Sequence, residues 1–222
     1  MYAQLTPLDT VFFRDGSPFT MGQENWGQSR FPPPPSVVYG ALRSRYLAEH
    51  PERLPDAGGP YDPTGEAQLT AFHLRDASGP LFPMPLDLVA TEDANPQRAG
   101  TEVTRLRRTT MPSGAAGLGR SPDVLSHPET VETVRESVVD RFALDEYLAG
   151  ERGPFNSFHL YEDGLVHREP KIGLRMDRTA RAADDGFLYR VGLHRLDDEV
   201  SFGVGIGNLS LDDEGLLKLG GE

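Results

Sequence analysis

A run of four prolines, Pro32 to Pro35, strongly constrains how the first fifty residues of this chain can fold. Each proline ring fixes φ at about −65° and removes a backbone donor, so the run is stiff. Before it we expect a strand from Leu5 to Arg14, and after it a helix from Val37 to Glu49 whose first N–H groups are capped by Ser36. A flexible polar loop followed by a rigid arm and a helix start predicts a binding edge.

The polar loop before the prolines carries Arg30 and Trp26, the only tryptophan of the chain. The start of the following helix is electropositive, which suits a phosphate or the 5′ end of a nucleic acid. The alternative is that the prolines merely start a core helix, with Leu42, Tyr46 and Tyr39 on its apolar stripe.

Three segments carry a resemblance to a known family. The first combines VFFRDGSPF, FPPPPS and YGALRS, the second is KIGLRMDRTARAADDGFLYRV from Lys171 to Val191, and the third is LLKLGGE at the C-terminus. Together they resemble the third subunit of the Cmr module, in the Cas5-like group of the RAMP superfamily. That family caps the 5′ tag of the guide RNA in type III-B CRISPR effector complexes. We see no such match between about residues 88 and 166.

The resemblance implies an α+β chain with a ferredoxin-like (RRM-like) RAMP fold, large insertions and a protruding β-hairpin. We expect residues 1–222 to form a single domain of this kind. The final LGGE is similar to the entrance of the glycine-rich loop of the superfamily, whose members run longer. We therefore expect a chain that is truncated at its C-terminus.

The middle of the chain predicts strands at Gln68–Arg75 and Leu81–Val89, and then an insertion over residues 90–165. Within the insertion, the valine spacing of Pro128–Leu148 predicts a helix. The insertion also contains a basic stretch with Arg105, Arg107 and Arg108. These arginines either meet phosphates or belong to a solvated loop.

Two alternating stretches, Lys171–Arg175 and Phe187–Leu193, predict a long β-hairpin over residues 171–193. The resemblance implies that its tip contacts guide RNA, and the alternative is a plain exposed hairpin. A further strand is expected at Val200–Leu209. The alternating glycines of its GVGIG segment do not match a dinucleotide fingerprint, and they leave room for another backbone or for RNA.

We assign RNA binding to residues of the first segment and of the hairpin. These are Arg14, Trp26, Arg30, Ser36, Tyr39, Arg43, Lys171, Arg175, Arg178 and Thr179. The partners that the resemblance implies are the 5′ tag of the guide RNA, the large polymerase-like subunit and the backbone RAMP subunits. No cofactor and no metal site is expected.

The sequence does not predict an enzyme. Zero cysteines exclude a cysteine nucleophile and cysteine zinc sites, and none of the six histidines falls in a recognised catalytic spacing. Two alternatives stay open at this point. One is a metal-independent guide-processing endoribonuclease of the same fold, and the other is a structural scaffold without RNA contact.

Charge is unusual for a chain that binds RNA, because 34 acidic residues face 22 basic ones and the net charge is -12. Twenty of the basic residues are arginines, and they concentrate in residues 101–120 and 165–195. The acidity reflects either a salty cytoplasm or a surface for a basic partner. With no apolar stretch approaching about twenty residues, we expect a soluble cytoplasmic protein without membrane contact.

Overall fold

In the computed structural model, the chain divides into two compact units. Unit 1 combines Met1–Phe72 with Val166–Glu222, and unit 2 is His73–Leu165. The structure describes residues 1–14, 16, 26–27, 29–91, 100–111, 122–177 and 182–220. Within these ranges, no helix is long and apolar enough to cross a membrane.

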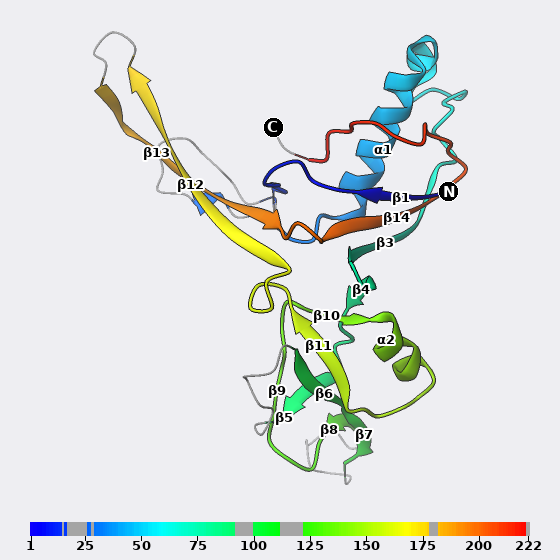
Figure 1. The fold of residues 1–222 in the computed structure, drawn as a ribbon, viewed down its shortest axis with the longest axis vertical. Coiled ribbons are helices and arrows are strands. Elements are labelled where there is room, and N and C mark those ends of the chain that lie inside the picture. The colour runs from blue at the N-terminus through cyan, green and yellow to red at the C-terminus, as the bar shows by residue number, and fades with distance from the viewer. Residues whose placement is uncertain are drawn as a thin grey trace. The chain divides into compact units, whose positions relative to one another are not determined.

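The sheet of unit 1 is built around β14 (Ser201–Gly207), which lies between β1 (Tyr2–Leu5) and β3 (Gln68–Asp76) (Figure 1). β1 is antiparallel to β14, and the amino group of Met1 donates to the Ile206 carbonyl oxygen at 2.7 Å. β14 is buried over nearly its whole length. The strands predicted at 68–75 and 200–209 are therefore confirmed.

A glycine of β14 lets β3 approach closely. A Cβ atom on Gly205 would lie 2.6 Å from Thr70 Oγ1 and 3.1 Å from the backbone nitrogen of Ala71. The first distance is shorter than real Cβ contacts, so a larger residue would force the two strands apart. The space beside Gly205 is thus occupied by the neighbouring strand β3.

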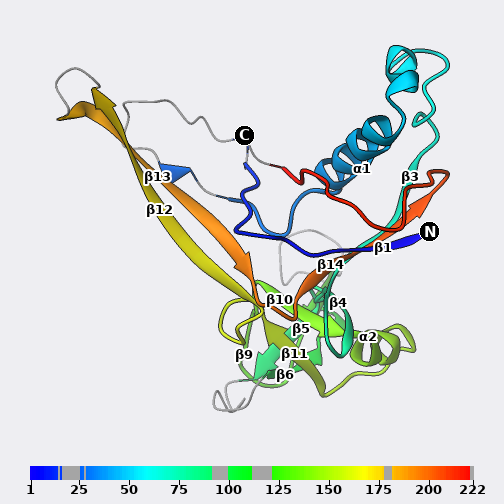
Figure 2. The ribbon, with the colours of Figure 1, turned by 45° about the horizontal axis from the view of Figure 1, so that its top comes forward.

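Helix α1 (Pro35–Glu49) packs on the same sheet (Figure 2). Its Val38 and Leu42 form a buried cluster with Val204 and Ile206 of β14. The predicted cap is wrong, because the helix begins at Pro35 and Ser36 lies inside its first turn with no capping hydrogen bond. Proline suits this first position, since its fixed φ is helical and its missing N–H would have no partner there. A short 3₁₀ helix, η1 (Pro51–Asp56), follows.

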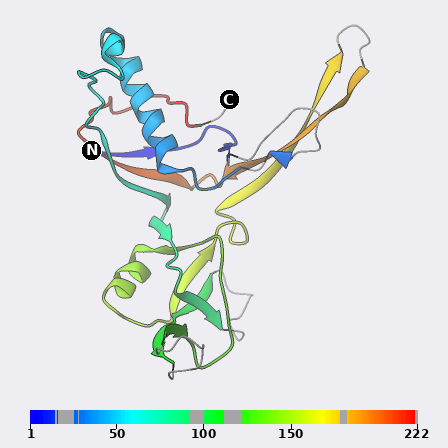
Figure 3. The same ribbon diagram turned by 180° about the vertical axis from the view of Figure 1, so that it is seen from behind.

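The predicted hairpin is confirmed and is longer than expected. β12 (Val166–Asp177) and β13 (Ala182–Leu196) are antiparallel and pair from Val166↔Leu196 outward, with one irregularity between Leu174 and Met176. Figure 3 shows them as a long two-stranded ribbon. A short strand, β2 (Trp26–Gly27), adds to β13 in parallel.

The N-terminal strand predicted over Leu5–Arg14 is wrong in its bounds. β1 ends at Leu5, and in the described residues 6–14 the chain makes two isolated bridges, Val11↔His194 and Arg14↔Ser29. Pro7 explains the break, because it has no N–H to donate to a ladder.

Unit 2 is a mostly antiparallel β-structure with one helix in its described part. From the end of β3 its strand order is β4, β10, β11, β6, β5 and β9. Their bounds are Gly79–Pro83, Ser137–Asp140, Phe155–His159, Thr101–Arg105, Leu88–Thr91 and Val131–Glu132, respectively. A separate two-stranded sheet contains β7 (Arg107–Thr110) and β8 (Asp123–Ser126).

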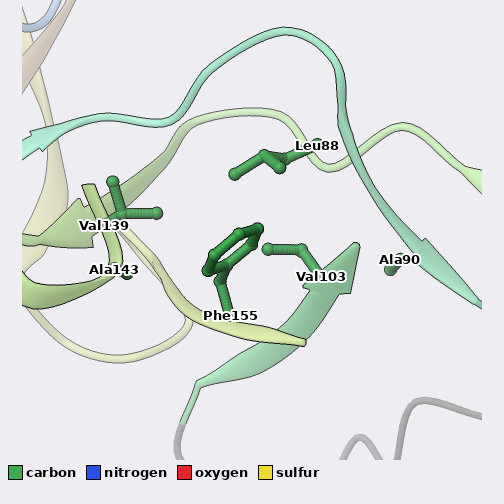
Figure 4. Close-up of a cluster of buried hydrophobic side chains, with 6 residues drawn as sticks. All are labelled: Leu88, Ala90, Val103, Val139, Ala143 and Phe155. Carbon is green, nitrogen blue, oxygen red and sulfur yellow. The ribbon is translucent and has the colours of Figure 1, made fainter. Parts of the chain in front are cut away.

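Phe155 is at the centre of the core of unit 2 (Figure 4). Its ring, 2% exposed, clusters with Leu88, Val103, Val139 and Ala143. Burial of such a side chain stabilises a fold by about 1.5–3 kcal/mol. The second unit therefore has a hydrophobic core of its own.

Two further predictions for this region are wrong. The helix expected over Pro128–Leu148 is confined to α2 (Arg141–Leu148), where Asp140 accepts a capping bond from the Ala143 N–H at 2.8 Å. Upstream, Val131 lies in β9, Val138 and Val139 lie in β10, and Glu136 has φ 51°, which no helix accommodates. The single strand expected at Leu81–Val89 is instead β4 and β5, joined by a turn.

The described chain is thus a mixed α/β protein with mostly antiparallel sheets. That part of the predicted fold class is confirmed. The predicted insertion of residues 90–165 lies within unit 2, which begins at His73.

Candidate nucleic-acid-binding site

Three segments of unit 1 meet at the base of the β12–β13 hairpin, and we call this region the hairpin base. They are residues 9–14, residues 26–27 with 29–31, and the β13 stretch from Arg190 to Leu196. Val11 and His194 exchange backbone hydrogen bonds of 2.7 and 3.0 Å. Trp26 lies opposite Arg190 in the ladder. Residues distant in sequence are thus joined by backbone hydrogen bonds.

Two aromatic side chains, Phe13 and His194, are buried at this junction. Phe13 is buried, and its N–H donates to Ser29 Oγ at 2.9 Å. His194 is also buried, with Nε2 at 3.2 Å from the Ser29 carbonyl oxygen and its ring centroid 5.1 Å from that of Phe31. The backbone N–H of Arg30 donates to the Phe13 carbonyl oxygen at 2.8 Å and so holds this residue at the junction.

Four exposed cations surround the hairpin base: Arg14, Arg30, Lys171 and Arg190. Among the described residues none of them forms an ion pair, although Lys171 Nζ lies 3.3 Å from Thr10 Oγ1. Arg190 was not among the predicted site residues. Its position in an alternating basic stretch was the signal that could have found it.

The hairpin presents different chemistry on its two faces. Ile172 is the ladder partner of Arg190, and cross-strand partners share a face, so an apolar side chain that is 65% exposed lies beside a cation. Lys171 belongs to the opposite face. An exposed apolar side chain next to an arginine is the kind of surface on which an unpaired base can stack.

Arg195 fastens residues after β1 to the hairpin. Its guanidinium donates to Glu169 at 2.5 and 3.1 Å and to Asp9 at 3.2 Å. The Arg195 hydrogen bond is the main cause that lowers the pKa of Glu169. The pKa of Asp9 is also lowered, first by the Thr10 N–H and then by Lys171 and Arg195. Both carboxylates are therefore held in the charged form.

The α1 residues predicted to bind RNA make internal contacts. Tyr39 Oη donates to the Thr64 carbonyl oxygen at 3.1 Å, and Arg43 donates to Thr64 Oγ1 at 2.8 Å and to Asp62 at 2.6 Å. Hydrogen bonds from Thr64, Gly58 and Arg43 hold the pKa of Asp62 far below its ordinary value. These contacts attach the loop before β3 to the helix.

The remaining predicted site residues are placed as follows. Ser36 is exposed on the first turn of α1, and Arg175 is part of β12. Trp26 is described by its backbone in β2. Arg178 and Thr179 lie outside the described residues. The structure thus brings Arg14, Arg30, Lys171 and the Trp26 backbone to one region.

Two arginines in the basic stretch of unit 2 form ion pairs within that unit. Arg105 pairs with Asp87 at 2.9 Å and lies 4.3 Å from the centre of the Tyr147 ring. Desolvation and the nearby Asp87 raise the pKa of that tyrosine. Arg108 pairs with Asp123, whereas Arg107 is exposed. Two of the three arginines proposed to meet phosphates therefore already have acidic partners.

No metal site emerges from the described part of the chain, where no group of three or more His, Asp or Glu side chains is arranged to hold an ion. The six histidines are also distributed over both units. His73 is buried, with Nδ1 2.6 Å from the Leu74 carbonyl oxygen.

Comparison with solved structures shows the fold. One similar chain is in a cryo-EM structure of the type III-B Cmr-beta complex bound to cognate target RNA, with 17% identity and a TM-score of 0.57. A second is in state 1 of that complex with cognate target RNA and AMPPnP, with 16% identity and a TM-score of 0.56. Each match covers 100% of this chain and 61% or 60% of the other, so the chain spans about three fifths of their length.

Sequence comparison identifies the family. No curated protein matches the chain. A family model does match, and it covers residues 3–222, nearly the whole length. Its description is "CRISPR-associated protein (Cas_Cmr3)". By this match the chain belongs to the Cmr3 family of CRISPR-associated proteins.

Proposed function

We propose that this chain is a subunit of a type III-B CRISPR effector complex that binds the 5′ repeat-derived tag of the guide RNA in antiviral defence. Membership of the Cmr3 family supports the assignment to such a complex. The solved structures of similar fold come from a type III-B Cmr-beta complex bound to cognate target RNA. A ferredoxin-like core is part of the same proposal.

The observation that carries the proposal is the convergence at the hairpin base. The loop before α1 and β13 are joined there by the Trp26↔Arg190 and Gly27↔Val191 pairings. Arg14, Arg30 and Arg190 are exposed around this junction and have no acidic partner among the described residues. Guanidinium groups of this kind bind phosphates in a bidentate manner and stack on bases.

The tag would be held as single-stranded RNA. Exposed arginines contact its phosphates, and unpaired bases stack on aromatic and apolar side chains. Ile172 and Arg190 offer such a platform on one face of the hairpin. The hairpin beyond this platform, with Arg175, Arg178 and Thr179 in its sequence, then fixes where guide pairing begins.

We further propose that the chain does not cut RNA. A metal-independent ribonuclease needs a histidine that can reach a ribose hydroxyl or a leaving group. The histidine closest to the proposed tag path in the ladder is His194, and its buried ring is engaged with Ser29 and Phe31. This environment favours binding over general acid–base chemistry.

Partners follow from the same assignment. The large polymerase-like subunit is proposed to dock beside the chain, and the backbone RAMP subunits to continue along the guide. Chemistry then resides in other subunits, while this subunit positions the RNA end.

The test uses labelled guide RNA with and without its 5′ tag, incubated with the chain alone and with the large subunit. We expect tag-dependent binding in an anisotropy assay and intact RNA on a denaturing gel. Cleavage that disappears on changing one histidine would establish the ribonuclease instead. Equal binding of tagged and untagged RNA, or no binding with the large subunit present, would rule out the tag-binding role.

A further inference from the structure

An acidic side chain, Asp9, holds the N-terminal segment against the hairpin. Its carboxylate is exposed and accepts a hydrogen bond from the Arg195 guanidinium at 3.2 Å. The same guanidinium is also held by β12, since Glu169 accepts from it at 2.5 and 3.1 Å. Carboxylates of two distant segments thus share one guanidinium, whose planar fork of donors suits such an arrangement.

This ion pair supplements a short backbone contact. Val11 and His194 form an isolated bridge of two hydrogen bonds. A single bridge restricts the angle between two segments less than a ladder of several pairs does. Asp9 lies two residues before Val11, and Arg195 directly follows His194, so their ion pair supplies a second point of attachment.

Cations of the proposed RNA site lie in both of the segments that are joined here. Arg14 belongs to the N-terminal segment, whereas Lys171 belongs to β12, and both are exposed. Lys171 Nζ also lies 3.3 Å from Thr10 Oγ1, directly beside Asp9. The spacing between these cations therefore depends on how firmly residues 9–14 are held to the hairpin.

We propose that Asp9 and Arg195 are positioning residues for the guide tag, because their ion pair fixes residues 9–14 at the hairpin before RNA binds. The inference rests on the proposed tag-binding function. A site that is already ordered does not have to immobilise these segments when the RNA arrives, and loss of that order should weaken binding by about three- to tenfold. The negative charge of Asp9 thus favours the binding of a polyanion.

The sign of one substitution tests this inference. Asp9→Ala removes a negative charge beside the proposed site, so Coulomb attraction alone predicts tighter binding of labelled guide RNA that carries its 5′ tag. Positioning predicts the opposite, a three- to tenfold weaker binding by anisotropy, to about the extent given above. Asp9→Glu keeps the carboxylate and should restore most of the affinity.

The matched control is Asp198→Ala. Asp198 is exposed just beyond β13 and forms no ion pair within the part of the chain that the structure describes. Its removal changes the net charge by the same amount as Asp9→Ala. We expect RNA binding to stay unchanged or to become tighter.

A double-mutant cycle tests whether Asp9 acts through Arg195. In a chain that already has Arg195→Gln, Asp9→Ala should no longer weaken RNA binding. Salt dependence separates positioning from direct contact. Asp9→Ala should leave the salt slope unchanged, whereas Arg14→Ala should reduce it by about 1, because a phosphate contact is lost.

A distance measurement tests the ion pair without RNA. The chain contains no cysteine, so Leu8→Cys and Ile172→Cys, both at exposed positions, place spin labels at these two sites alone. Double electron–electron resonance should give a narrow distribution of distances that broadens when Asp9→Ala is added. Urea unfolding should show a midpoint that is little changed, since an exposed ion pair contributes little to stability.

The outcomes separate this inference from the function on which it rests. Equal or tighter RNA binding by Asp9→Ala, with tag-dependent binding by the unchanged chain, would overturn the positioning role and leave the tag-binding function standing. An unchanged distance distribution would overturn it as well. Additive effects in the cycle would exclude Arg195 as the partner through which Asp9 acts. Failure of the unchanged chain to bind tagged RNA would overturn the proposed function, and the inference with it.

Discussion

The exposed arginines at the hairpin base of unit 1 have different surroundings from Arg105 and Arg108 of unit 2. In unit 2, Arg105 and Arg108 have acidic partners in Asp87 and Asp123. At the hairpin base of unit 1, Arg14, Arg30 and Arg190 are exposed without such partners among the described residues. Exposed ion pairs contribute only about 0–1 kcal/mol to folding, whereas unpaired arginines remain available for phosphates. The number of arginines in a stretch therefore does not show where RNA binds.

The largest expected effect is a loss of stability when the core of unit 2 is changed. Phe155→Ala should lower the free energy of unfolding by about 3–5 kcal/mol, because it leaves a cavity among Leu88, Val103 and Val139. Urea unfolding followed by circular dichroism measures the loss. Phe142→Ala, at a position 70% exposed in the same unit, is the control and should change stability by less than about 0.5 kcal/mol. Similar losses for the two variants would contradict the assigned core.

The next effect concerns RNA. Arg30→Ala combined with Arg190→Ala should weaken guide-tag binding by about 10- to 100-fold at low salt and reduce the salt slope by about 1–2, because two phosphate contacts are lost. Arg108→Ala removes one positive charge from unit 2, where Asp123 already pairs with it, and should change affinity by much less than half of that effect. Titrations of labelled RNA from low to molar salt give both quantities. If the unit 2 variant had the larger effect, the RNA site would lie there instead.

Two glycine substitutions in unit 1 should change the free energy of unfolding by an intermediate amount. Gly205→Ala should destabilise the chain by about 1–3 kcal/mol, because its Cβ would lie 2.6 Å from Thr70 Oγ1. Gly40→Ala in α1 meets nothing within 4 Å and should stabilise the chain by about 0.5–1 kcal/mol. Thermal unfolding of both variants checks these opposite signs. A neutral Gly205→Ala would show that β3 is not so close to β14.

The smallest effect is a pH dependence. Folding lowers the pKa values of Asp9 and Glu169 below their ordinary values of 3.8 and 4.5. Their stabilisation is therefore present above these values and declines as the pH falls below about 4.5. Urea unfolding from pH 7 to pH 3 should show a smaller loss for Glu169→Gln than for the unchanged chain. An identical pH dependence would mean that Arg195 contributes no stability through Glu169.

The sequence predicted the regular part of the fold well and the irregular part poorly. Alternation over Gln68–Arg75 and in the hairpin was decisive, because a period of two fits only a strand. The valines at 131, 134 and 138 also fit a helical spacing, and the helix was excluded only by tertiary packing and by Glu136. The first strand was predicted too long because Pro7 was not read as a break.

The sequence also predicted only part of the candidate site. The sequence shows which residues are basic, but ion pairs such as Arg43–Asp62 or Arg105–Asp87 join residues 19 or 18 positions apart. No local pattern reveals such partners. Conversely, Arg190 became a candidate only when the ladder placed it opposite Trp26. The RNA-binding roles themselves stay predictions.

The division of the chain also has a consequence for the order in which its parts can form during synthesis. Unit 2 is one continuous stretch, whereas unit 1 combines the segments before and after it. Domains fold as units while the chain emerges from the ribosome, so unit 2 can fold while unit 1 is still incomplete. The backbone partners of Val11 and Trp26 are His194 and Arg190. A nascent chain therefore has no assembled hairpin base until synthesis has passed residue 194.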